Sequence, residues 1–87
     1  MMAVLEGLLF IAGEDGLTID DIVNALEVDL QIAKQLIDEL KLINDKSNRG
    51  LMIKEVAGKY KLTTKPEHIE YYQKFASLEI NNALSQA

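Results

Sequence analysis

The sequence has no cysteine, a single histidine, a single proline and a single arginine. Without cysteine, neither a disulfide bond nor a thiolate metal site can form. One histidine cannot build a zinc site or a cysteine–histidine catalytic pair, and we expect His68 to be a core or boundary residue. The three serines, Ser47, Ser77 and Ser85, have no base spaced to activate them. We therefore expect no enzyme activity, no catalytic residue, no metal and no cofactor.

Long hydrophobic runs are also missing. The longest runs, such as that from Leu8 to Ala12, are far too short to cross a bilayer. No basic region precedes an apolar stretch at the N-terminus, which argues against a secretory signal. We therefore expect a cytoplasmic protein without membrane contact. A domain of 87 residues buries only about 60% of its unfolded surface, so contact with a partner would add significantly to its stability.

The charges are unevenly distributed along the chain. Residues 1–45 carry ten acids and two lysines, a net charge of −8, whereas residues 46–87 carry seven bases and four acids, a net charge of +3. The two halves sum to the overall charge of −5. The domain therefore has an acidic part and a mildly basic part.

The first 45 residues predict three helices. Apolar residues recur at helical spacing from Met2 to Ala12, and Gly13 is placed to end that helix. Thr18 is the expected N-cap of a second helix up to Leu26, with Asp21 completing a weak variant of the capping box. Asp29 is the expected cap of a third helix that runs from residue 30 to about residue 44. The residues expected on the apolar faces of the first and third helices are Val4, Leu5, Leu8, Leu9, Ile11 and Ala12, and Ile32, Ala33, Leu36, Ile37, Leu40 and Ile43, respectively.

The remainder predicts a β-hairpin and a fourth helix. The runs "LMIKEV" and "YKLTTK" favour strands, and Gly58 between them is expected to adopt a positive φ. Val56 breaks the alternation of Leu51 and Ile53, so a bulge or the turn should begin near it. Tyr60 and Leu62 should point inward, and Pro66 should start the last helix. The apolar face of that helix is expected to hold His68, Ile69, Tyr72, Phe75 and Ala76.

This order of elements is that of a winged helix-turn-helix. We predict a mostly α, small α+β fold with three helices, a β-hairpin wing and a C-terminal helix. Residues 1–76 form the predicted domain, and residues 77–87 form a connector. Such a fold most often serves DNA binding, but a fold alone does not establish a function.

Three stretches resemble one known family. "LEGLLFIAGEDGLTIDDI" is similar to the opening of segregation and condensation protein B, "GLMIKEVAGKYKLTTKPE" resembles the wing of that family, and "ALSQA" resembles the approach to its second winged helix. The resemblance covers essentially the whole chain. It implies an N-terminal winged-helix domain whose second winged helix is absent from this chain.

The resemblance also implies a function and partners. The family acts in chromosome segregation as a homodimer, together with a kleisin subunit (segregation and condensation protein A) and a structural-maintenance-of-chromosomes (SMC) ATPase. In that family the N-terminal winged helix is associated with dimerisation, and the second winged helix with kleisin contact. The expectation is a non-catalytic, cytoplasmic, nucleoid-associated dimerising module.

The helical wheel suggests where a dimer interface could lie. Phe10 falls outside the predicted apolar arc of the first helix and beside Ala3 and Gly7, so a two-fold contact could place each Phe10 over the small residues of its partner. Tyr71 lies off the apolar face of the last helix in the same way. Two alternatives stay open: Phe10 could pack within its own chain, and Tyr71 could simply be solvated.

A DNA-binding transcription regulator is the main alternative function. The predicted third helix has a net charge near zero, so it offers phosphate no net attraction. The second helix carries Asp20, Asp21 and Glu27, which would repel phosphate. We therefore expect no sequence-specific DNA binding. Weak phosphate contact could come from four cations in and near the wing: Arg49, Lys54, Lys59 and Lys61. These lysines could equally be solvated residues that protect a strand edge.

Overall fold

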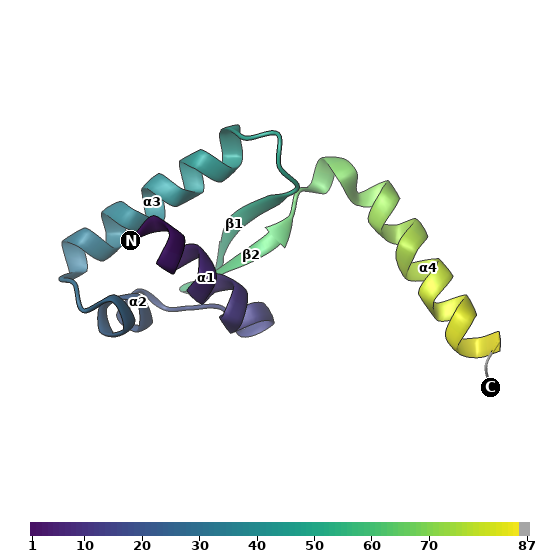
Figure 1. The fold of residues 1–87 in the computed structure, drawn as a ribbon, viewed down its shortest axis with the longest axis horizontal. Helices are drawn as coiled ribbons and strands as arrows, with labels where there is room; N and C mark the ends of the chain where they lie inside the picture. Colours follow the sequence, from purple (N-terminus) through teal and green to yellow (C-terminus); the bar gives the residue numbers. More distant parts are fainter. Residues whose placement is uncertain (86–87) are drawn as a thin grey trace.

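The computed structural model describes the backbone of residues 1–85 and the side-chain environment of residues 1–78. Helix α1 (Met2–Ala12) leads through a 3-10 turn η1 (Gly13–Asp15) to α2 (Ile19–Leu26) and α3 (Leu30–Lys46). The hairpin of β1 (Leu51–Val56) and β2 (Lys59–Thr64) follows, and a 3-10 turn η2 (Pro66–His68) leads into α4 (Ile69–Ser85). This is the predicted winged helix-turn-helix order (Figure 1). Helix α4 runs without a break across the predicted domain boundary at residue 76.

The second helix begins as its sequence predicts. The backbone N–H of Asp21 donates to the Thr18 hydroxyl at 3.1 Å, and the N–H of Thr18 donates to the Asp21 carboxylate at 2.9 Å. This is a complete capping box, with Asp in the place of the usual Glu. The hydrogen bond that the Thr18 backbone N–H donates to the Asp21 carboxylate, together with hydrogen bonding from the Thr18 side chain, lowers the pKa of Asp21. Asp29 caps α3 by accepting from the N–H of Ile32 at 2.8 Å.

The hairpin has a regular register and a two-residue turn. Leu51 pairs with Thr64 at one end and Val56 with Lys59 at the other, so the turn begins at Val56 without a bulge. Gly58 has a φ of 78°, as predicted, and Ala57 also has a positive φ, at 53°. Positive φ at both central residues is typical of the turns whose twist matches that of a hairpin.

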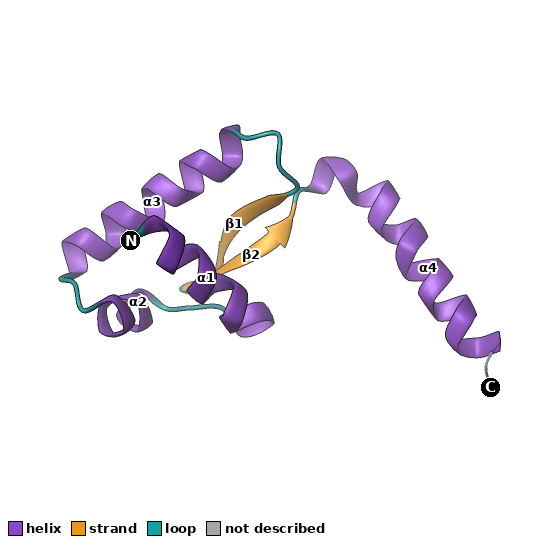
Figure 2. Cartoon of the chain, in the orientation of Figure 1, coloured by secondary structure: helices purple, strands orange, loops and turns teal. Residues whose placement is uncertain are grey.

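The core lies between the first three helices and the hairpin (Figure 2). The fully buried large side chains come from α1, α2, α3 and β1; they are Leu5, Leu9, Ile22, Ile37 and Ile53. Tyr60 and Leu62 pack against this cluster, as predicted for inward-facing residues of β2.

Four apolar positions predicted for the inner faces are instead exposed. Val4 and Ile11 on α1 are 53% and 81% exposed, and Ile32 and Ile43 on α3 are 41% and 57% exposed. The reason is that each helix meets the core along a narrower stripe than its apolar arc. On α3, the stripe is completed by Asn44, which is buried where Ile43 was expected to be.

Helix α4 extends away from the domain (Figure 1). Its predicted apolar face does not pack on the core of its own chain: Phe75 and Ile69 are 64% and 50% exposed. The proline-led turn η2 is 3-10 in form, so the α-helix proper begins three residues after Pro66. Its start is fixed by Lys65, whose backbone N–H donates to the carbonyl of Gly50 at 3.0 Å.

Candidate functional site

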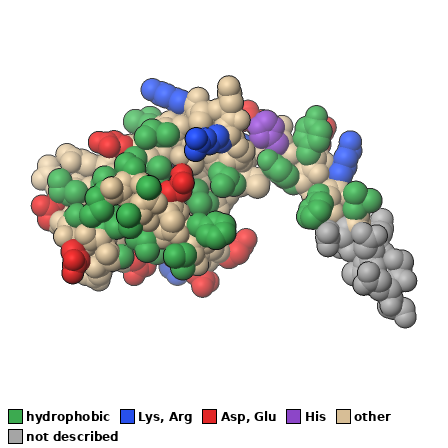
Figure 3. Space-filling view, viewed as in Figure 1, with side chains coloured by type: hydrophobic (Ala, Val, Ile, Leu, Met, Phe, Trp, Pro, Cys, Tyr) green, Lys and Arg blue, Asp and Glu red, His purple; other side chains and the backbone are tan. Residues whose placement is uncertain are grey.

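Helix α1 is apolar on both its inner and outer sides. Leu5 and Leu9 face the core and are fully buried, whereas Phe10 is 78% exposed. The outward-facing residues are mostly small or hydrophobic: Ala3, Val4, Gly7, Phe10 and Ile11. We call these five residues the outer face of α1. Figure 3 shows hydrophobic side chains gathered over the domain and along α4. A helix that is hydrophobic all round is normally covered on both sides.

A groove runs between α1 and the base of the hairpin. Its volume is about 470 Å³. The wall from α1 holds Ala3, Glu6, Gly7 and Phe10, and the opposite wall holds Leu51 and Leu62, with Asn44, Arg49 and Gly50 completing the lining. We call this the α1 groove. The structure therefore brings three of the predicted interface residues to one concave apolar surface.

Tyr71, the fourth predicted interface residue, lies on α4. It is 71% exposed, and the ammonium of Lys74 lies 5.9 Å from the centre of its ring. Helix α4 leads away from the domain in Figure 1, so Tyr71 and the outer face of α1 belong to separate surfaces of the chain.

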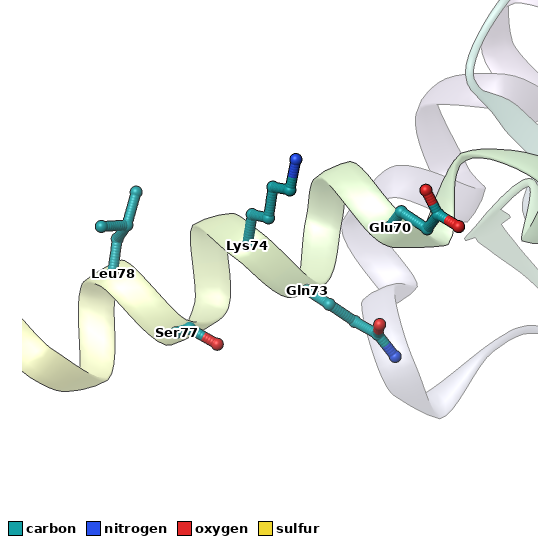
Figure 4. Close-up of a pocket in the computed structure, with 5 residues that line it drawn as sticks. All are labelled: Glu70, Gln73, Lys74, Ser77 and Leu78. Carbon is teal, nitrogen blue, oxygen red and sulfur yellow. The ribbon is translucent and has the colours of Figure 1, made fainter.

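A second hollow, of about 570 Å³, lies beside α4. The residues that border it all come from α4 (Figure 4): Glu70, Gln73, Lys74, Ser77 and Leu78. Lys74 and Leu78 extend to one side of the helix, and Gln73 and Ser77 extend to the other. A hollow bordered by a single exposed helix does not enclose a small molecule. It is part of an open helix surface.

The structure does not gather the four predicted phosphate-contacting cations into one patch. Lys54 and Lys61 lie directly opposite each other on β1 and β2. Lys59 follows the hairpin turn, close enough to Asp21 to help lower the pKa of that carboxyl. Arg49 lies at the other end of the hairpin, in the α1 groove. Only the Lys54–Lys61 pair offers two adjacent positive charges.

Lys65 has a structural role that the sequence did not reveal. It is only 6% exposed, and its ammonium donates to the carbonyl of Ser47 at 2.7 Å. Ser47 is the C-cap of α3, and an ammonium favours the negative end of a helix. The side chain therefore ties the end of α3 to the start of η2.

His68 and the acidic side chains were the other candidates for a site in the sequence. Within residues 1–85, no three histidine, cysteine, aspartate or glutamate side chains are close enough to hold a metal ion. His68 is half-buried, and its imidazole lies 3.7 Å from the carboxylate of Glu67. No helix in the described part of the chain is long and apolar enough to span a membrane.

Comparison with known proteins identifies the family. Residues 3–87 match the family described as the segregation and condensation complex subunit ScpB. The chain belongs to the ScpB family. Its resemblance to segregation and condensation protein B, drawn from the motifs, is confirmed.

Curated ScpB proteins align along the whole of this chain. Segregation and condensation protein B of Halalkalibacterium halodurans is 37% identical over 87 residues, which cover all of this chain and 44% of that protein. The protein of the same name from Bacillus mycoides is 41% identical over 85 residues, which cover 98% of this chain and 45% of that protein. The chain therefore spans less than half the length of these relatives.

A solved ScpB structure has the same fold. It is described as a dimer of the ScpB N-terminal domain complexed with a ScpA peptide. It is 39% identical, with a TM-score of 0.82, over 85% of this chain and 91% of the solved chain. The winged-helix fold predicted from the sequence agrees with this ScpB neighbour.

Proposed function

We propose that this domain is the dimerising module of a ScpB subunit and that, as a dimer, it binds a segment of the kleisin ScpA. Through the complete subunit it would serve a bacterial SMC–kleisin complex in chromosome segregation, in the cytoplasm and at the nucleoid. Its role would be non-catalytic. The solved relative, a ScpB dimer with a ScpA peptide, supports both the homodimer and the partner.

The exposed Phe10 is the observation that carries the dimer proposal. A large aromatic side chain that is 78% exposed is beside Ala3 and Gly7, on a helix whose other side forms the core. Exposed apolar patches of this kind mark interaction surfaces, and aromatic residues are common anchors in them. We therefore assign the outer face of α1 to the interface. We assign Tyr71 to it as well, because Tyr71, Phe75 and Leu78 are exposed apolar residues along one side of α4.

Light scattering and calorimetry test this proposal directly. The purified chain is expected to have twice its monomer mass of 9.7 kDa. Titration with purified ScpA should give saturable binding, and Leu42→Ala, which alters an exposed residue of α3, should leave both results unchanged. A chain that is monomeric at high micromolar concentration would overturn the homodimer, and a dimer that does not bind ScpA would overturn the kleisin assignment.

The transcription-regulator alternative is not favoured. Helix α3 carries Lys34, Lys41 and Lys46 against Asp38, Glu39 and Asp45, so its net charge is zero. Asp20 and Asp21 are exposed on α2. A DNA-binding helix-turn-helix protein needs a positive surface on these two helices, because phosphate contacts supply most of the non-specific affinity for DNA.

Weak phosphate contact through the wing is a minor part of the proposal. Like charges placed directly opposite each other on a hairpin are destabilising, so the Lys54–Lys61 pair has a cost that an anion would relieve. Gel shifts with random duplex DNA at low salt are expected to show weak binding that Lys54→Gln with Lys61→Gln abolishes. Tight binding that falls steeply with salt and depends on α3 would instead favour the regulator.

A further inference from the structure

Helix α4 presents a row of apolar side chains to solvent. Tyr71, Phe75 and Leu78 are 71%, 64% and 61% exposed. Their spacing, four residues and then three, places them in one row along the helix. A helix gains most of its stability in a protein by packing such a row against something else. We therefore expect this row of side chains to pack against another molecule or another part of the protein.

The start of α4 lies at the rim of the α1 groove. A Cβ placed on Gly50, which lines that groove, would lie 3.2 Å from the hydroxyl oxygen of Tyr72. Among the large apolar side chains described on α4, up to residue 78, Tyr72 is also the least exposed. Beyond Tyr72 the helix leads away from the domain (Figure 1), so the row cannot reach the groove of its own chain without a change in the direction of α4.

We propose that α4 of one copy lies in the α1 groove of a second copy, and that the second copy returns the contact. Tyr71 and Phe75 then pack against Ala3 and Gly7, with Phe10 beside them. The contact is isologous, so each copy contributes one helix and one groove. This inference rests on the homodimer proposed above and specifies which element covers Ala3, Gly7 and Phe10 on the outer face of α1.

Two observations favour this exchange over a contact between the two α1 helices alone. An α1–α1 contact would leave the α4 row in water, whereas the exchange covers the row and the groove together. The charges also match: Glu6 and Arg49 line the groove, while Lys74 and Glu70 lie one turn apart beside the row. In the exchange, Lys74 can face Glu6 of the other copy and Glu70 can face Arg49. These charge pairs would set how far α4 lies along the groove.

The second copy is also a better occupant than the remainder of a longer ScpB chain. The solved dimer is described as one of the N-terminal domain, and this chain matches 91% of the chain in it. A domain of this kind therefore pairs without the other half of the subunit. That observation is why the proposal places a second copy, rather than a following domain, on the row.

Cross-linking tests the exchange, because the chain has no native cysteine. Ala3→Cys in one tagged chain and Lys74→Cys in another place a thiol in the groove and beside the row, and both keep the aromatic side chains. After the two are mixed and allowed to exchange subunits, a short bis-maleimide is expected to give a covalent heterodimer. Gln73→Cys is the matched control, since Gln73 extends to the opposite side of α4 from Lys74 (Figure 4).

Each outcome of the cross-linking is decisive. A heterodimer with Lys74→Cys and none with Gln73→Cys supports the exchange. Efficient linking of Ala3→Cys to itself, without a mixed product, would show an α1–α1 interface and overturn the exchange. A chain that light scattering shows to be dimeric but that forms no mixed product would also overturn it, while the homodimer would stand. A monomeric chain would overturn both.

A second measurement tests the same contact without a cross-linker. Phe75→Ala should weaken dimerisation at least about tenfold, because it truncates the centre of the row. Gln73→Ala should leave the dissociation constant unchanged. Both side chains are exposed in a single chain, so circular dichroism should show the same helix content for both variants. Equal dimerisation by the two variants would overturn the exchange.

Discussion

Phe10→Ala is expected to convert the dimer into a folded monomer. Within one chain the ring of Phe10 is 78% exposed, so its loss should change the stability of the fold by no more than about 0.5 kcal/mol. Buried in the two-fold contact, it would be a hot spot worth about 2 kcal/mol or more, counted once for each subunit. Since a tenfold change in dissociation constant is about 1.4 kcal/mol, the double loss weakens dimerisation roughly a thousandfold.

Sedimentation equilibrium and circular dichroism on the same samples check this result. Leu42→Ala is the control, because it removes another exposed hydrophobic side chain, on α3, from outside the α1 groove. A Phe10→Ala variant that remains dimeric at low micromolar concentration would place the interface elsewhere. A variant that unfolds would contradict the exposure of the ring and place Phe10 in the core of its own chain.

The parts of the fold that follow from local chemistry could be predicted from the sequence. Thr18 and Asp29 are helix caps because their side chains accept from backbone N–H groups only three residues ahead. Gly58 takes a positive φ because a two-residue hairpin turn requires it. Each of these signals lies within a few residues of the structure it specifies, so no knowledge of the tertiary fold is needed.

The faces of the helices could not be assigned in the same way. Periodicity shows that α1 is apolar, but it does not distinguish residues that meet the domain's own core from residues that meet a partner. Val4 and Ile11 fit the helical pattern as well as Leu5 does, yet they are exposed. The burial of Lys65 depends on the carbonyl of Ser47, which is 18 residues away in the sequence. Such long-range placements are set by packing rather than by local pattern.

The candidate interface shows the same division. The wheel identified Phe10, Ala3 and Gly7 because they share one flank of a single helix. The facing wall of the groove, Leu51 and Leu62, comes from the hairpin, and only the docking of α1 against the hairpin brings these residues together. The exposed row on α4 could not be fully predicted for a related reason. The sequence pattern places Phe75 on the inner face of α4 and Tyr71 off that face, although the two lie one turn apart on the same side of the helix.

Gly16→Ala is expected to be the most damaging single-methyl change in the chain that we can identify. Gly16 has a φ of 72° and a ψ of −178°, a backbone region that is essentially restricted to glycine. A Cβ there would lie 2.8 Å from the carbonyl oxygen of Tyr60. That oxygen accepts from the N–H of Leu17 at 2.8 Å, and Tyr60 donates back to Leu17 at 2.7 Å. The added methyl group therefore strains the backbone and pushes apart the two-bond bridge that holds the wing to the segment before α2.

The combined loss should be about 3 kcal/mol, from strain of roughly 1–3 kcal/mol and from weakening of two hydrogen bonds worth roughly 1 kcal/mol each. For a domain of this size that corresponds to a fall of more than about 10 °C in the thermal midpoint. Gly58→Ala is the matched control, because Gly58 has a similar φ of 78° but open space where the Cβ would be. It should cost only about 1 kcal/mol. Because dimerisation makes the midpoint depend on concentration, both variants should be measured in the Phe10→Ala background once that form is shown to be monomeric. Equal losses at the two glycines would mean that the contact with Tyr60 adds nothing to the strain, and that the bridge yields to the extra methyl group.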